Sequence, residues 1–182
     1  MPATWPCSGP AGLVDEHAVV FDRTRAARLL IVPPLFEEMN RTRRFLVETQ
    51  RQLDGLGIDS MLPDLPGCNE STQAFSGQSL GSWRTAMAAA AHHFAATHVL
   101  AVRGGALVFP THLPGWGLEP VKGTTILRQL LRARQLHAHH VVGTARPAAL
   151  AFIGELPDPA FGLAVAVGES LVQRALAATC AN

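Results

Sequence analysis

The chain has 182 residues, of which 48% are hydrophobic and 16% are charged, and its formal net charge is +1. These values predict one globular domain over residues 1–182 and leave no large basic field for nucleic acid. No apolar run reaches the roughly 20 residues of a membrane helix, so we expect no membrane-spanning segment. The three cysteines are odd in number and far apart, which fits neither a disulfide framework nor a metal site. We therefore expect a cytoplasmic protein without a metal or another cofactor.

The first third of the chain alternates apolar runs with a helical period. Residues 1–16 are rich in Pro, Gly and Ala, which predicts an irregular N-terminal segment. Strands are expected at 17–21, 28–32 and 58–62, and the spacing of apolar residues predicts a helix over 41–56. A helix between two buried strands is typical of a right-handed parallel crossover. The pattern predicts an α/β fold, a three-layer α/β/α sandwich with a mainly parallel sheet.

A second crossover follows. Ser79 is a suitable N-cap for a helix over 79–96, and a buried strand is expected at 98–102. A brief helix and a sixth strand within 116–121 come next. Further on, residues 148–153 are expected as a strand and residues 168–178 as a helix.

The segment Ala101-Val102-Arg103-Gly104-Gly105 has the pattern of a nucleophile elbow. In that motif, G-x-S-x-G, a serine occupies the tip of a strained turn between a strand and a helix, and small residues flank it. Small residues stand at both ends here, but the tip carries Arg103. A guanidinium remains protonated in proteins and cannot attack a carbonyl carbon. The sequence therefore predicts the turn of a hydrolase without its serine.

Two loops strengthen this interpretation. Residues 33–40 read P-P-L-F-E-E-M-N, and residues 63–68 read P-D-L-P-G-C. Over residues 28–134 the chain resembles the exosortase A system-associated hydrolases, type 2, a branch of the α/β-hydrolase superfamily in which arginine at the elbow tip is usual. The resemblance implies a hydrolase scaffold linked to exopolysaccharide production and export. Members of that family have two further strands after this region. Residues 137–182 are therefore expected to be a divergent C-terminal segment of a shortened fold.

The triad of an α/β-hydrolase has the order nucleophile, acid, histidine. Asp158 is the one aspartate after the elbow, and the histidines of the His137 to His140 cluster precede it, which is the wrong order. The backbone amides of Phe36 and Gly104 are our candidates for an oxyanion hole. One hypothesis is therefore an ester or thioester hydrolase with a non-standard nucleophile. The candidate side chains for that role are Ser71, Ser76, Ser79 and Cys68.

The other hypothesis is a pseudoenzyme that binds a ligand or acts as a scaffold. Arg103 at the end of a strand and beside a helix N-terminus suits a small anionic or acyl ligand. Internal pairing is the favoured alternative, with Glu37, Glu38 or Asp64 as the partner, because their loops leave the same edge of the sheet.

Two surface features complete the sequence-based expectations. Arg128, Arg132 and Arg134 are expected on a solvated helix face, with an anionic polymer or partner as the alternative. An uncovered edge strand in the shortened fold would favour a homodimer.

Overall fold

The computed structural model describes residues 1–10 and 12–138, so the expectations at 148–153 and 168–178 lie outside the described residues. Within the described residues, one sheet has six strands in the order β1-β2-β4-β3-β5-β6. The strands are β1 (Pro2–Gly9), β2 (Gly12–Phe21), β3 (Arg28–Val32), β4 (Asp59–Pro63), β5 (His98–Val102) and β6 (Gly115–Leu118). The helices are α1 (Glu37–Gly55), α2 (Leu80–His93) and α3 (Gly123–Ala138), with the 3-10 turns η1 (Phe75–Gly77) and η2 (Arg103–Leu107).

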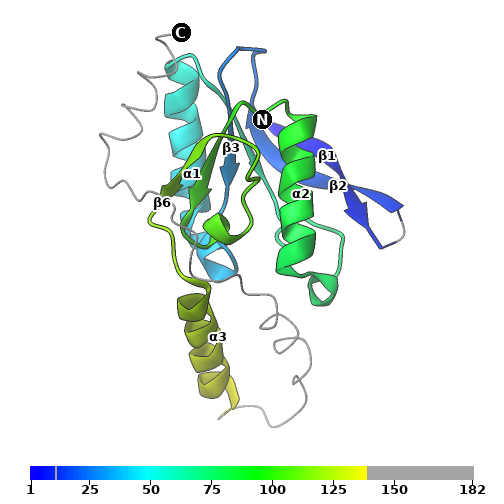
Figure 1. Cartoon of the computed structure of the whole chain (residues 1–182), viewed down its shortest axis with the longest axis vertical. Helices are drawn as coiled ribbons and strands as arrows, with labels where there is room; N and C mark the ends of the chain where they lie inside the picture. Colours follow the sequence, from blue (N-terminus) through cyan, green and yellow to red (C-terminus); the bar gives the residue numbers. More distant parts are fainter. Residues whose placement is uncertain (11, 139–182) are drawn as a thin grey trace.

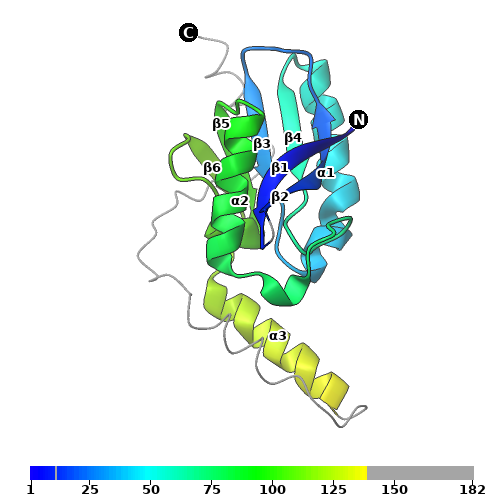
Figure 2. The same ribbon diagram turned by 90° about the vertical axis from the view of Figure 1, so that its right-hand side faces the viewer.

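The predicted three-layer architecture with a mainly parallel sheet is confirmed. Strands β4, β3, β5 and β6 are parallel neighbours, and β2 joins β4 in the antiparallel direction. Helix α1 covers one face, where Leu46 and Leu53 pack with Ile31 and Leu62. Helix α2 covers the other face, so the sheet lies between two helices (Figure 1, Figure 2).

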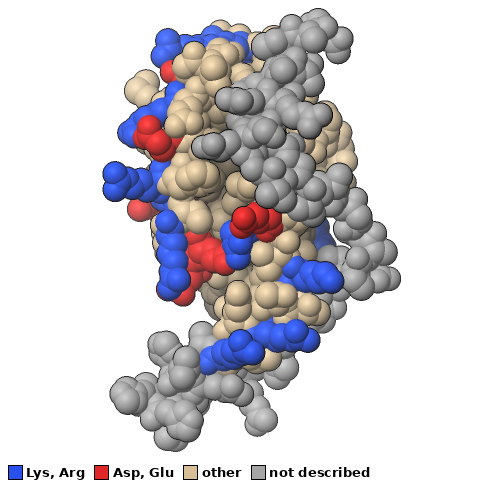
Figure 3. All heavy atoms as spheres, turned by 90° about the vertical axis from the view of Figure 1, so that its left-hand side faces the viewer, with Lys and Arg blue, Asp and Glu red and all other residues tan. Residues whose placement is uncertain are grey.

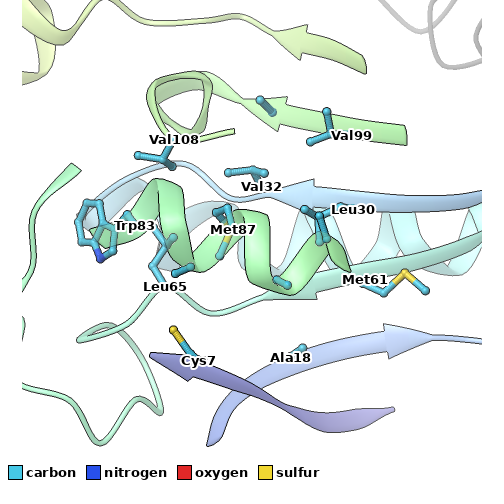
Figure 4. Close-up of a cluster of buried hydrophobic side chains, with 14 of the residues drawn as sticks. Cys7, Ala18, Leu30, Val32, Met61, Leu65, Trp83, Met87, Val99 and Val108 are labelled. Atoms are coloured by element: carbon cyan, nitrogen blue, oxygen red, sulfur yellow. The ribbon is translucent and has the colours of Figure 1, made fainter. Parts of the chain in front are cut away.

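The larger core lies under α2 and contains the side chains drawn in Figure 4. Trp83 and Met87 of α2 are fully buried against the sheet residues Leu30 and Met61. The indole Nε1 of Trp83 donates a hydrogen bond to the carbonyl oxygen of Pro66 at 2.9 Å, which satisfies the polar atom of this buried ring. The regularly spaced apolar residues from which α2 was predicted therefore form the face of the helix that packs on the core.

The helix boundaries follow from local chemistry. Ser79 caps α2 as predicted, and it forms a reciprocal capping box with Ser82. Helix α1 begins at Glu37, four residues before the expected Arg41. Its N-cap is Phe36, whose side chain cannot cap, so the sequence held no conventional start signal at this position.

The expectation of an irregular segment at residues 1–16 is wrong. Residues Pro2–Gly9 and Gly12–Phe21 form a β-hairpin, with Trp5 opposite Glu16. Side chains alternate along β1, so Trp5 and Cys7 are buried while Pro6 faces outward. Strand β1 is the edge of the sheet, where proline is tolerated because its missing N–H is not needed. The prolines in this segment favoured the prediction of irregular structure, although the side chains alternate between buried and exposed as in a regular strand.

An ion network holds together the N-terminal ends of the parallel strands β3 and β4. Asp59 is fully buried and accepts hydrogen bonds from Arg25 Nη1 at 3.3 Å and Arg28 Nη1 at 3.1 Å. Arg28 also binds Asp22, and this hydrogen bond lowers the pKa of Asp22 to about 2. A lowered pKa in the folded state means that the stabilisation is present above the usual pKa of aspartate and disappears as the pH falls towards 2. The network serves stability at the edge remote from the elbow.

The hairpin yields a direct test of the corrected N-terminus. Replacing Trp5 with alanine removes a fully buried indole from the core, and we expect a loss of about 3 to 5 kcal/mol in the free energy of unfolding, measured with urea. Leu13 lies in the same hairpin but is 77% exposed, so Leu13→Ala should change stability by less than about 0.5 kcal/mol. Equal effects of the two substitutions would contradict the packed hairpin.

Candidate functional site

The turn after β5 is tight and begins with an unusual backbone conformation. Arg103, directly after the strand, has φ 50°, in the left-handed region that side chains other than glycine avoid. A Cβ atom on Gly105 would lie 2.5 Å from the carbonyl oxygen of Pro33 and one on Gly104 would lie 2.9 Å from Cδ1 of Ile126. Gly105 is therefore required by close packing against backbone, whereas at Gly104 the neighbours are side chains, which would have to shift to admit a Cβ atom. The sequence-based prediction of the elbow agrees with this geometry.

The helix expected after the elbow is a single 3-10 turn, η2. Val108 ends this turn, and Pro110 follows before a second helical turn can form. So short a turn lacks the aligned peptide dipoles that would attract an anion. The expected contribution of a helix N-terminus to anion binding at Arg103 is therefore wrong.

Arg103 is held by two carboxylates. Its Nε and Nη2 atoms donate to the two oxygens of Glu38 at 2.9 and 3.0 Å, and its Nη1 atom donates to Glu119 Oε2 at 3.1 Å. The hydrogen bonds to Glu38 raise the pKa of Arg103 further above its usual value. The Arg103 and Glu38 side chains are 31% and 34% exposed, so water screens the pair in part.

The predicted internal pairing of Arg103 is confirmed for Glu38. Glu37 instead binds Arg41 on the surface at 2.7 Å. Asp64 is buried and binds Arg43 as well as Nδ2 of Asn69. Neither carboxylate is brought to the elbow tip.

Glu119 was missed by sequence reasoning. It follows the short strand β6, whose register with β5 pairs Leu118 with Val102 and so places the next residues beside the tip. Its position near Arg103 could have been predicted from the rule that loops at the carboxyl ends of parallel strands lie at one edge of the sheet. That rule applies to the loop after β6 as much as to the loops after β3 and β4.

The loop after β3 packs directly on the elbow. A Cβ atom on Gly104 would lie 3.1 Å from Cγ of Leu35, the residue before Phe36. Phe36 has φ 61°, and its ring lies 5.7 Å from that of Trp83. The assignment of the Phe36 and Gly104 amides to an oxyanion hole stays a prediction.

The other candidate nucleophiles are engaged in loop structure. The Ser71 hydroxyl donates to Glu16 Oε1 at 2.8 Å and accepts the backbone N–H of Gly67. Burial, with the nearby charges of Asp64 and Glu16, raises the pKa of Cys68 to about 11, so its thiol is not ionised near neutral pH. Ser79 caps α2, and Ser76 is exposed in η1.

Glu16 is a second polar residue that the sequence did not reveal. It is fully buried, and its Oε2 atom has no hydrogen-bond partner among the described residues. Its Oε1 atom accepts from Gln73 as well as Ser71, so this carboxylate anchors the loop after β4. It lies in the segment that we expected to be irregular.

Among residues 1–10 and 12–138, no group of three or more His, Cys, Asp or Glu side chains could hold a metal ion. No helix in this described part of the chain is long and apolar enough to cross a membrane.

Comparison with known proteins identifies the fold. No protein-family model matches the chain, and no curated protein sequence matches it. A protein from Agrobacterium vitis S4 that is described as a hydrolase superposes with a TM-score of 0.54 at 17% identity, covering 76% of this chain and 60% of that protein. The likeness establishes a hydrolase-like α/β fold.

Two other solved structures give lower scores. XC6422 from Xanthomonas campestris, described as an α/β serine hydrolase without a lid, has 17% identity and a TM-score of 0.45, covering 67% of this chain and 62% of that protein. An N-formylmaleamic acid deformylase from Pseudomonas putida S16 has 17% identity and a TM-score of 0.43, covering 81% and 66%. The chain thus spans about 60% of the length of the first two proteins.

The close packing of the elbow can be tested with glycine substitutions. Gly105→Ala places a methyl group against the carbonyl oxygen of Pro33, and we expect it to cost about 1 to 3 kcal/mol of unfolding free energy. Gly55, in the last turn of α1, has open space where a Cβ atom would lie, so Gly55→Ala should be neutral or stabilising by up to about 1 kcal/mol. A neutral Gly105→Ala variant in thermal and urea unfolding would show that the turn does not pack as described.

Proposed function

We propose that this chain is a non-hydrolytic member of the α/β-hydrolase structural class that serves exopolysaccharide production or export. The observation that carries the proposal is the arginine at the elbow tip, fixed between Glu38 and Glu119. The link to exopolysaccharide rests on the resemblance of residues 28–134 to the exosortase A system-associated hydrolases of type 2.

The chemistry of the tip supports a role without hydrolysis. A guanidinium has no lone pair to offer to a carbonyl carbon, and its contact with Glu38 favours the charged form. Nucleophilic catalysis needs a hydroxyl or thiol with a base beside it. An oxyanion hole alone gives only a small part of the rate of a complete triad.

The same tip connects three loops into one unit. Glu38 follows β3, Arg103 follows β5 and Glu119 follows β6, so two salt bridges join the carboxyl ends of three strands. Ligands of open α/β sheets bind at this edge. A rigid edge of this kind suits a binding or scaffold role.

A small anionic or acyl ligand is the proposed occupant. Both oxygens of Glu38 are used by Arg103, whereas Glu119 is 66% exposed and binds through one oxygen only. A ligand carboxylate could therefore replace Glu119 on Nη1 and leave the pair with Glu38 intact. Such an exchange keeps Arg103 neutralised throughout.

The alternative function is an ester or thioester hydrolase with a non-standard nucleophile. The contact between Ser71 and the buried carboxylate of Glu16 is the observation in its favour. Two backbone N–H groups, of Gly67 and Gln73, also donate to the Ser71 oxygen and lower its nucleophilicity. We therefore place this function second.

Labelling with a fluorophosphonate separates the two functions. We expect the purified chain to remain unlabelled by intact-protein mass spectrometry and to show no turnover of short-chain esters, because no activated serine occupies the elbow. Arg103→Ser should gain no turnover, since the ionisable side chains that contact this position among the described residues are Glu38 and Glu119, not a histidine that could take the proton of the new hydroxyl. It should lose about 1 kcal/mol of stability, because Glu38 and Glu119 lose their shared cation.

The controls for this experiment are Ser71→Ala and a known serine esterase labelled in parallel. Stoichiometric labelling that Ser71→Ala abolishes would establish the alternative function. Ester turnover by Arg103→Ser would overturn the proposal in another way, because it would reveal a working base beside the tip.

A further inference from the structure

Helix α3 projects from the body of the protein. Figure 1 and Figure 2 show it extending below the sheet and its two covering helices. At its start, Ile126 lies near Gly104 of the elbow, where its Cδ1 atom would be 2.9 Å from an added Cβ. Every residue from Arg128 to Arg132 is exposed. These five residues of α3 are therefore largely in contact with solvent.

An unsupported helix of this length needs a surface to pack on. Isolated helices shorter than about 12 to 15 residues are marginal in water, and in proteins the stability of a helix comes mainly from packing of an apolar face. α3 has 16 residues. Leu130 and Leu131 are 39% and 42% exposed, and Leu127 lies one turn before them. These three leucines form an apolar face, here called the leucine face, of which Leu127 is half-buried and Leu130 and Leu131 are exposed.

The charge of α3 has a single sign. The helix contains Arg128, Arg132 and Arg134 but no Asp or Glu, and no acidic residue occurs between Pro120 and Gly154. Exposed arginines on α1 are different, because each has a carboxylate one turn away, as in the pair of Arg51 with Glu48. On the face drawn in Figure 3, the lower part of the molecule shows blue side chains and no red ones outside the grey residues.

We propose that α3 docks on an anionic phospholipid surface. A basic amphipathic helix lies in the membrane interface with its apolar side among the headgroups, while its cations meet lipid phosphates. The leucine face and the uninterrupted positive charge of α3 match both requirements. Because α3 projects from the body, no other helix or strand of the described residues lies between it and a membrane surface.

Other occupants fit the helix less well. A second copy of α3 would bring two sets of arginines together without a carboxylate, which is electrostatically unfavourable. Nucleic acid would use the arginines through its phosphates but would leave the leucine face in water. The membrane proposal is independent of whether the elbow is catalytic.

Co-sedimentation of the full chain with lipid vesicles tests the proposal. We expect binding to vesicles of equimolar phosphatidylglycerol and phosphatidylcholine, weakening at high salt, and no binding to pure phosphatidylcholine. Arg128→Gln with Arg132→Gln should lower the partition coefficient roughly 25-fold, because each cation near an anionic surface is worth about a factor of five. Leu130→Ser with Leu131→Ser should lower it by about tenfold or more.

The matched control is Arg44→Gln with Arg51→Gln. It removes the same charge from exposed positions on α1, and it should change the partition coefficient by less than about threefold. All six replaced side chains are exposed, so circular dichroism should show that each variant keeps its fold.

Three outcomes would overturn the proposal. The first is no binding, or equal binding to both kinds of vesicle. The second is an equal loss of binding in the α1 control, which would mean that net charge alone is sensed. The third is a dimer in light scattering that the leucine substitutions dissociate without any vesicle binding, which would assign the leucine face to self-association.

Discussion

The close packing of the turn after β5 against the end of β3 is the constraint on which the position of Arg103 depends. Gly105 lies so close to the carbonyl oxygen of Pro33 that no side chain fits between them. Two residues earlier, Arg103 has a left-handed conformation at the tip of the turn. Backbone strain of this kind persists only where surrounding structure enforces it. Here the strain places a cation, not a nucleophile, where three loops converge.

The ion pairs at the tip connect the strained residue to two neighbouring loops. Arg103 joins Glu38 and Glu119, so two ion pairs connect the loops after β3, β5 and β6. The loop with Glu119 leads directly into α3, which rests on the elbow through Ile126. This arrangement agrees with a protein that binds and positions other molecules.

Much of the fold could be predicted from the sequence because buried parallel strands carry continuous apolar runs, as at 29–32 and 99–102. The pairing of Arg103 with Glu38 followed from the convergence of strand ends at one edge. The hairpin of β1 escaped detection because its outward positions carry proline. Glu119 escaped because β6 has only four residues, two of them glycine, and leaves little pattern.

The central claim is that Arg103 locks the elbow through Glu38, and a double-mutant cycle tests it most directly. Urea unfolding would be measured for the native chain, Arg103→Gln, Glu38→Gln and the double variant. Because the contact is bidentate but partly exposed, the account predicts a favourable coupling free energy of about 0.5 to 1 kcal/mol that decreases with added salt. Additive effects of the two substitutions, with no coupling at low salt, would contradict it.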